Sequence, residues 1–148
     1  MQKEKSAGFI IVKQNANGMY HVLGLQVFGR IDVPKGHVEK NESDLQAAFR
    51  ECEEESGLKI TKKDMLWGRE SINISRHHKD VILYLAKIPD LQEPSIQRNP
   101  ETGMLEHDSF HWLTWEQAVY KCHPYLINGF IWARNKILQK EKERKNSM

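Results

Sequence analysis

Three glutamates within one short stretch have the types and spacing to do chemistry. Glu54 and Glu55 follow Glu51 at i+3 and i+4, so on a helix their carboxylates lie on one side. Each like-charge pair at this spacing costs about 0.2–0.5 kcal/mol, and the negative end of the helix dipole lies nearby. A positive partner is therefore expected. Clustered carboxylates suit Mg²⁺ or Mn²⁺, which bind a few protein oxygens and take further ligands from substrate phosphates.

An acidic helix face can also be a solvated surface, and the residues around the three glutamates decide between the two interpretations. The pattern is a Gly, five residues, a Glu, seven residues, Arg-Glu, an apolar residue, any residue, Glu-Glu, any residue, Gly and an aliphatic residue. The chain fills it with Gly36, Glu42, Arg50, Glu51, Cys52, Glu54, Glu55, Gly57 and Leu58. This pattern resembles the Nudix box at every position, with Cys52 as the apolar residue, where a buried thiol packs as a small hydrophobe. By this resemblance the chain is identified as a Nudix hydrolase.

The resemblance implies an α+β fold, an α/β/α sandwich with a mixed β-sheet, in which the box forms a loop, a helix and a loop that bind a divalent metal. The implied ligands of Mg²⁺ or Mn²⁺ are the Gly36 carbonyl, Glu51, Glu54, Glu55 and Glu106. Catalytic roles are expected for Glu51, Glu54, Glu106 and Arg50. Arg50 would brace the acidic cluster or make an ordinary surface ion pair, and Glu42 would brace the loop. Glu106 would be a metal ligand, a general base or a solvated acid.

A narrower resemblance covers most of the chain. Segments 6–11, 33–39, 79–86 and 106–113 resemble the asymmetric diadenosine tetraphosphate hydrolase branch. The run from Pro34 to Glu39 is the most telling, although many other Nudix members have a second Gly where this chain has His37. This branch implies a nucleotide polyphosphate substrate.

Candidate substrate-binding residues follow from the same segments. Lys35 and Lys79 are point charges suited to a polyphosphate, and His37 would contact phosphate or close the loop. Aromatic residues could stack a base, although an aromatic at helix or strand periodicity more often belongs to the core. The aromatic candidates are Tyr84, Phe110, Tyr125 and Phe130.

Several functions remain open. The leading hypothesis is a metal-dependent hydrolase that cuts dinucleoside tetraphosphates asymmetrically into a nucleoside monophosphate and a triphosphate. The main rival is a pyrophosphohydrolase or decapping enzyme acting on RNA 5′ ends; ADP-ribose, other nucleotide sugars and inositol pyrophosphates are weaker alternatives. A binding module without catalysis is disfavoured, because it would tolerate loss of Glu51, Glu54 and Glu55.

Length and composition predict one globular domain over residues 1–148. The chain is 39% hydrophobic and 28% charged, which is typical of a soluble protein with a core. No apolar run approaches a membrane span, and residues 1–5 lack the apolar stretch of a secretion signal. A soluble cytoplasmic protein without an obligate protein partner is expected. Cys52 and Cys122 stand apart from each other and from any zinc-type spacing, so neither a disulfide nor a zinc site is expected.

The C-terminal segment, about 134–148, is basic. It contains six Lys or Arg residues and two Glu residues, which could indicate binding to RNA. The alternative, which the sequence favours, is a solvated helix end whose cations complement the helix dipole.

Hydrophobic periodicity predicts the elements that must position these residues. The first elements are a hairpin and a loop at 32–37. A helix follows, which begins at the capping pair Ser43 and Gln46 and ends at Gly57. An irregular loop at 89–105 precedes helices interrupted by Pro124. The expected strands are 8–12, 20–27, 66–74, 81–88 and 110–113.

Overall fold

The computed structural model describes residues 4–89 and 92–147. Its strands are β1 (Glu4–Gln14), β2 (Tyr20–Val27), β3 (Arg30–Asp32), β4 (Lys35–His37), β5 (Ile72–Arg76), β6 (Lys79–Lys87) and β7 (Ser109–Leu113). Its α-helices are α1 (Asp44–Ser56), α2 (Trp115–Lys121) and α3 (Ile127–Asn146), and its short 3₁₀ helices are η1 (Lys62–Asp64) and η2 (Pro124–Leu126).

The strands form one mixed sheet around β1. The order is β3-β2-β1-β6-β5, with β4 paired to β1 and β7 paired to β2. Strand β1 runs parallel to β6, and the other pairings are antiparallel. One end of β1 pairs with β4 and the other end with β2, so this long strand connects the two halves of the sheet.

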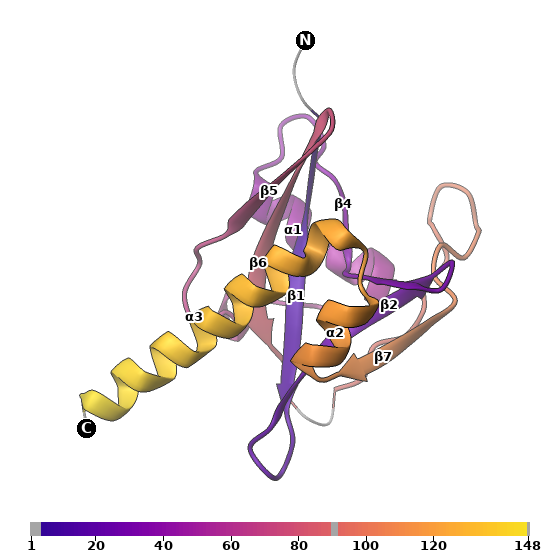
Figure 1. Cartoon of the computed structure of the whole chain (residues 1–148). Coiled ribbons are helices and arrows are strands. Elements are labelled where there is room, and N and C mark those ends of the chain that lie inside the picture. The colour runs from indigo at the N-terminus through magenta and orange to yellow at the C-terminus, as the bar shows by residue number, and fades with distance from the viewer. Residues whose placement is uncertain (1–3, 90–91, 148) are drawn as a thin grey trace.

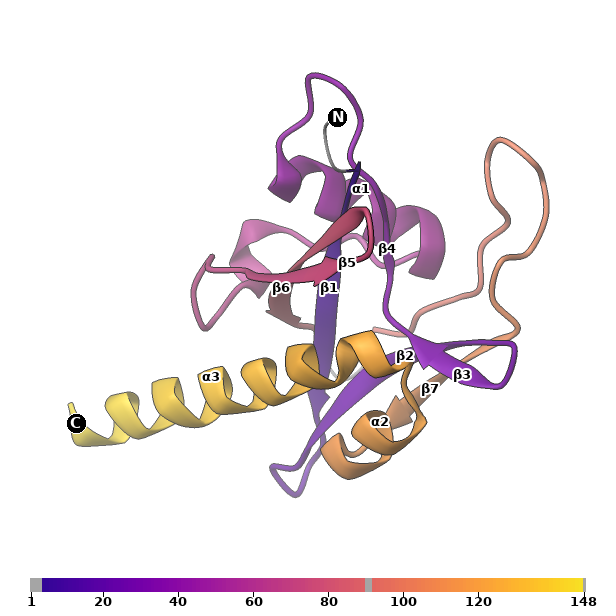
Figure 2. The ribbon, with the colours of Figure 1, turned by 45° about the horizontal axis from the view of Figure 1, so that its top comes forward.

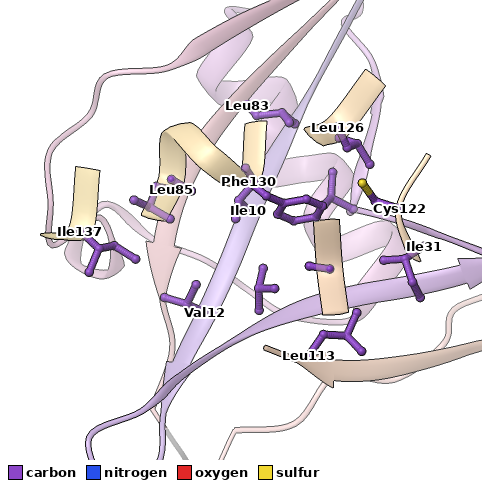
Figure 3. Packing of buried hydrophobic residues seen from close by; sticks show 14 of the residues in the cluster. Ile10, Val12, Ile31, Leu83, Leu85, Leu113, Cys122, Leu126, Phe130 and Ile137 are labelled. Carbon is purple, nitrogen blue, oxygen red and sulfur yellow. The ribbon is translucent and has the colours of Figure 1, made fainter. Parts of the chain in front are cut away.

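Helices cover both faces of the sheet, which confirms the predicted sandwich. Alternate residues of β1 point to opposite faces, and Phe9 and Ile11 belong to the core beneath α1. Ile10 and Val12 belong to the core beneath α2 and α3, where Phe130 is buried among them (Figure 3). Figures 1 and 2 show α1 on one side of β1 and β6 and α3 on the other.

Helix α1 begins and ends as its sequence predicts. The Ser43 side chain accepts a hydrogen bond from the Gln46 backbone N–H, and the Gln46 side chain accepts one from the Ser43 N–H. This capping box satisfies donors that the first turn leaves free. Gly57 ends the helix in the left-handed region, with a φ of 73°, which glycine adopts without steric cost.

In two segments the structure has a different element from the predicted one. Residues 66–71 form no strand; the chain turns at Gly68, which has a φ of 110°, and Trp67 packs edge-on against Tyr20 in the core. The predicted loop at 32–37 contains β4, whose three residues are too few to produce a periodic signal and which forms only because β1 lies beside it. The hairpin, the irregular segment 92–105 and the break at Pro124 are confirmed.

Helix α3 extends beyond the sheet toward the C-terminus (Figures 1 and 2). It carries the predicted basic segment, of which residue 148 lies outside the described residues. Within residues 4–89 and 92–147, no helix has both the length and the apolar character needed to cross a membrane.

Candidate active site

The backbone of β4 lies directly against the acidic side of α1. Gly36 pairs with Ala7 of β1, and a Cβ atom added at position 36 would collide with the Glu51 carboxylate. Only glycine therefore lets this carboxylate approach the strand. The structure thus brings together Gly36 and Glu51, two of the residues expected to hold the metal.

Arg50 connects the carboxylates of the predicted site. Its Nε and Nη2 atoms donate to the two Glu42 oxygens at 2.8 and 3.0 Å. Its Nη1 atom donates to Glu51 at 2.9 Å and to Glu54 at 3.2 Å, and Nη2 also donates to the His37 carbonyl at 2.9 Å. The guanidinium fork thus ties the helix to the loop, which is the bracing arrangement that bidentate Arg–carboxylate pairs provide.

Glu42 binds both Arg50 and the backbone of the loop before α1. One of its oxygens also accepts a hydrogen bond from the Glu39 backbone N–H at 3.0 Å. The hydrogen bonds from Arg50 hold the pKa of the Glu42 carboxyl below its usual range. Glu42 therefore braces the loop, as predicted, and is not one of the residues lining the acidic cleft.

Two glutamates of α1, Glu51 and Glu55, lie in a partly desolvated place that disfavours their negative charge. Burial raises the pKa of Glu51 despite Arg50, and Glu54 and Glu106 raise it further. Burial also raises the pKa of Glu55 to about 8, although its carboxylate accepts the Lys35 backbone N–H at 3.0 Å. Carboxylates with such shifts are stabilised by an added cation.

Glu106, which directly follows the irregular segment 92–105, lines the same cleft. The cleft has a volume of about 280 Å³ and is lined by Glu51, Glu54, Glu55 and Glu106, together with Gly36, His37, Glu39, Arg50 and residues 99–101. Asn99 donates a hydrogen bond from Nδ2 to Glu106 at 2.6 Å. No pattern in the sequence marks Asn99, because its partner is set by how the loop folds back.

The donors of this cleft fit a hard divalent cation in chemistry, because carboxylate and carbonyl oxygens are what Mg²⁺ and Mn²⁺ prefer. Across the described part of the chain, however, no three His, Cys, Asp or Glu side chains are arranged to hold a metal ion. Arg50 pairs with Glu51 and Glu54, and Asn99 pairs with Glu106. A metal would therefore compete with Arg50 and Asn99 for these carboxylates.

Of the predicted phosphate-binding residues, His37 lines this cleft and Lys35 adjoins it through its backbone N–H. His37 is exposed at its edge. The Lys35 Nζ atom donates to Asp32 at 3.1 Å, and the Tyr125 hydroxyl donates to the other Asp32 oxygen at 2.8 Å. Burial, and then Lys35 and Arg76, lower the pKa of Lys79. Sequence reasoning missed Asp32, which connects two of the predicted residues.

The aromatic candidates divide between core and site. Phe130 is 1% exposed beneath α3, so it belongs to the core, which is the alternative that its helix periodicity favours, and it is excluded as a base-stacking residue. Tyr84 packs against Phe9, with ring centroids 5.8 Å apart, and Phe110 packs against the core beneath α1. Packing accounts for these three side chains, whereas Tyr125 alone among the four candidates contacts a predicted phosphate-binding residue.

Known proteins resemble this chain both in sequence and in fold. A family model described as the NUDIX domain matches residues 3–131. An asymmetrical bis(5′-nucleosyl)-tetraphosphatase from Sus scrofa is 33% identical over 112 residues, covering 73% of this chain and 65% of that protein. The Mus musculus protein of the same description is 36% identical over 89 residues, covering 57% of this chain and 56% of that protein. The chain thus spans less than two thirds of the length of these relatives.

Solved structures resemble the chain over most of its length. A C. elegans Ap4A hydrolase binary complex has a TM-score of 0.71 at 25% identity, covering 93% of this chain and 98% of that chain. The Nudix hydrolase RenU from M. smegmatis has a TM-score of 0.72 at 15% identity, covering 94% of this chain and 88% of that chain. The second likeness is one of fold alone.

Proposed function

The chain belongs to the Nudix family, and we propose that it is a pyrophosphohydrolase that cleaves diadenosine tetraphosphate and related dinucleoside polyphosphates asymmetrically, with Mg²⁺ or Mn²⁺, in the cytoplasm. The observation that carries this proposal is the cleft in which Glu51, Glu54, Glu55 and Glu106 face one another beside Lys35. Carboxylates next to cations are what the hydrolysis of a phosphoanhydride requires.

The metal would be held by the carbonyl of Gly36 and the carboxylates of Glu51, Glu54, Glu55 and Glu106. When bound, a divalent ion neutralises phosphate charge and acidifies water. Arg50 acts on the same carboxylates by fixing their orientation, through bonds of 2.9 Å to Glu51 and 3.2 Å to Glu54.

The chain's other residues bind and orient the substrate. Lys35 and Lys79 bind the negative oxygens of the polyphosphate, and His37 lies at the edge of the cleft. Glu106 holds a proton-accepting oxygen in the cleft, kept in place by Asn99, and serves as a general base or as a metal ligand. Orientation of the phosphate chain by these cations selects the phosphorus that water attacks.

Asymmetric cleavage is supported by the relatives and by the arrangement of charge. The two relatives are described as asymmetrical bis(5′-nucleosyl)-tetraphosphatases, and the C. elegans structure as an Ap4A hydrolase. Lys35 adjoins the acidic cleft through its backbone N–H bond to Glu55, so a tetraphosphate bound by Lys35 would extend from the cleft in that direction. Attack would then fall away from the centre of the phosphate chain.

Product analysis in labelled water tests this proposal. Hydrolysis of diadenosine tetraphosphate in H₂¹⁸O with Mg²⁺ should give AMP and ATP, with the label in only one of them, because a single attack adds one solvent oxygen. Two molecules of ADP would contradict asymmetric cleavage. The control is the same reaction with excess chelator, in which no product should form.

A second candidate function is the release of pyrophosphate or a cap from RNA 5′ ends. It is supported by the run of cationic and imidazole side chains at the turn between β5 and β6, which is Arg76, His77, His78 and Lys79. Rapid pyrophosphate release from triphosphorylated RNA, without cleavage of diadenosine tetraphosphate, would favour this function. ADP-ribose and inositol pyrophosphates belong in the same substrate panel.

A further inference from the structure

Three cationic side chains are directed to the same face of the sheet. Paired residues on neighbouring strands point to the same side. In the register, Lys79 of β6 pairs with both Glu4 of β1 and Arg76 of β5, and Lys35 of β4 pairs with Gly8 of β1. Glu4 and Gly8 are an even number of residues from the β1 positions that form the core beneath α3. Lys35, Arg76 and Lys79 therefore share the α3 side of the sheet.

Tyr125 joins two of these cations. The Arg76 guanidinium carbon lies 3.9 Å from the centroid of the Tyr125 ring, within the range of a cation–π contact. The Tyr125 hydroxyl donates to Asp32, which also accepts the Lys35 Nζ hydrogen bond. One tyrosine thus fixes Arg76 through its ring and Lys35 through Asp32.

The ring of Tyr125 is surrounded by these contacts. Besides Arg76, the His123 ring centroid lies 5.2 Å away and the Lys35 Nζ atom lies 5.7 Å from the ring centroid. A nucleobase could stack on the face that Arg76 covers only by displacing the guanidinium. This arrangement argues against the base-stacking role that the sequence suggested for Tyr125.

We propose that Arg76 is a third phosphate-binding residue, and that Tyr125 is a positioning residue that holds Arg76 and, through Asp32, Lys35 around the distal part of a polyphosphate. This inference deepens the proposed function and rests on it for the identity of the substrate. A guanidinium held over a ring still has N–H donors at its edge, which can bind phosphate oxygens in a fork.

The charge balance supports an anionic ligand at this place. Asp32 is paired with Lys35, whereas among the ion pairs of the described residues none involves Arg76 or Lys79. Lys79 pairs with Glu4 in the register, so three cations stand against the two carboxylates of Asp32 and Glu4, and positive charge remains in excess. The adjacent acidic cleft begins at Gly36, one residue from Lys35, whose backbone N–H bonds to Glu55. On this proposal a phosphate chain would run from the cleft past Lys35 to Arg76, because the Lys35 Nζ atom shares Asp32 with Tyr125, whose ring contacts Arg76.

Binding of inorganic tripolyphosphate in the presence of chelator tests the proposal without any catalytic turnover. Titration calorimetry should give a dissociation constant raised roughly tenfold in Arg76→Gln, the loss expected for one charge-assisted hydrogen bond. The matched control is Arg69→Gln, an exposed arginine outside the cluster, which should bind as the wild type does. Equal affinity of Arg76→Gln and the wild type would overturn the proposal.

Two variants of Tyr125 separate its roles. Tyr125→Phe keeps the ring and should retain most of the Arg76-dependent affinity, whereas Tyr125→Leu should weaken tripolyphosphate binding as much as Arg76→Gln does. Thermal melting checks that both variants fold. If Tyr125→Leu instead loses adenosine binding while tripolyphosphate binding is unchanged, the tyrosine stacks a base and the proposal is wrong.

Kinetics with diadenosine tetraphosphate provide the second readout. An interaction made equally in the ground state and the transition state changes KM and leaves kcat unchanged, so Arg76→Gln should raise KM about tenfold at constant kcat. If the wild type does not hydrolyse this substrate, the proposed function fails, while the tripolyphosphate titration still decides the role of Arg76.

Discussion

Arg50 of α1 donates two hydrogen bonds, at 2.8 and 3.0 Å, to Glu42, which lies eight residues earlier in the loop before the helix. The same guanidinium reaches Glu51 and Glu54. One cation therefore fixes the positions of three carboxylates relative to one another. The arginine of the box acts here as a brace whose geometry depends on its planar fork.

Arg50→Lys tests whether the fork matters beyond its charge. Lysine keeps the charge but cannot bond Glu42 through two atoms and reach Glu51 and Glu54, so we expect kcat/KM to fall on the order of 10–100-fold. The Mg²⁺ concentration for half-maximal activity should change as well, since Arg50 and the metal share ligands. Lys40→Ala, in the same loop and exposed, is the control. Wild-type kinetics in Arg50→Lys would show that the brace is dispensable.

The sequence predicts the box well because most of the contacts within it are local. The partners of Arg50 lie one, four, eight and thirteen residues away, so helix periodicity and a short loop suffice to bring them together. The capping box and the left-handed Gly57 are local for the same reason.

What the sequence misses depends on contacts between distant segments. Tyr125 and Asp32 are 93 residues apart, and Lys35 meets Glu55 through its backbone N–H, which carries no sequence signal. Strand β4 is defined only by its partner β1. Phe130 and Tyr84 could not be separated from site aromatics by type, because burial of an aromatic is decided by the packing of α3 and α1 on the sheet.

Gly36→Ala should inactivate the enzyme through Glu51. The added Cβ would meet the Glu51 carboxylate, so this side chain must leave its place and kcat/KM should fall by at least about tenfold. The measurement is a double-mutant cycle with Glu51→Ala. If Glu51 carries the effect, Gly36→Ala costs nothing further in the Glu51→Ala background. Additive losses would assign the effect to the strand instead.

Glu54→Gln should remove a metal ligand while leaving the fold intact. The change is isosteric and abolishes one negative charge in the cleft, so we expect a loss of rate on the order of 10²–10⁴. Glu55→Gln should behave alike. The melting temperature in chelator should change little for Glu54→Gln, because this side chain is partly exposed. A Glu54→Gln enzyme with wild-type rate, or full wild-type activity in excess chelator, would contradict the metal site.

Cys52, the unusual residue of the box, should be replaceable without loss of activity. Its side chain is fully buried on the inner face of α1, and burial raises the pKa of its thiol to about 12, so Cys52 should not react with a thiol reagent at pH 8 in the native protein. Cys52→Ala should keep wild-type kcat/KM and lose about 1 kcal/mol of unfolding free energy, measured by urea denaturation. Rapid labelling of the folded protein at Cys52 would contradict this packing role.

The end of α3 can be divided at Glu141 into a part that packs and a part that does not. The Tyr20 hydroxyl donates to Glu141 at 2.7 Å, whereas residues 142–147 are exposed. Truncation after Glu141 should therefore leave the melting temperature and the hydrolysis of diadenosine tetraphosphate unchanged. Truncation after Gln139 also removes the partner of the half-buried tyrosine and should cost about 1 kcal/mol, as should Glu141→Ala alone. If the cations beyond Glu141 instead bind RNA, the shorter truncation will weaken RNA affinity and reduce its dependence on log salt by about one unit for each phosphate-binding cation that is removed.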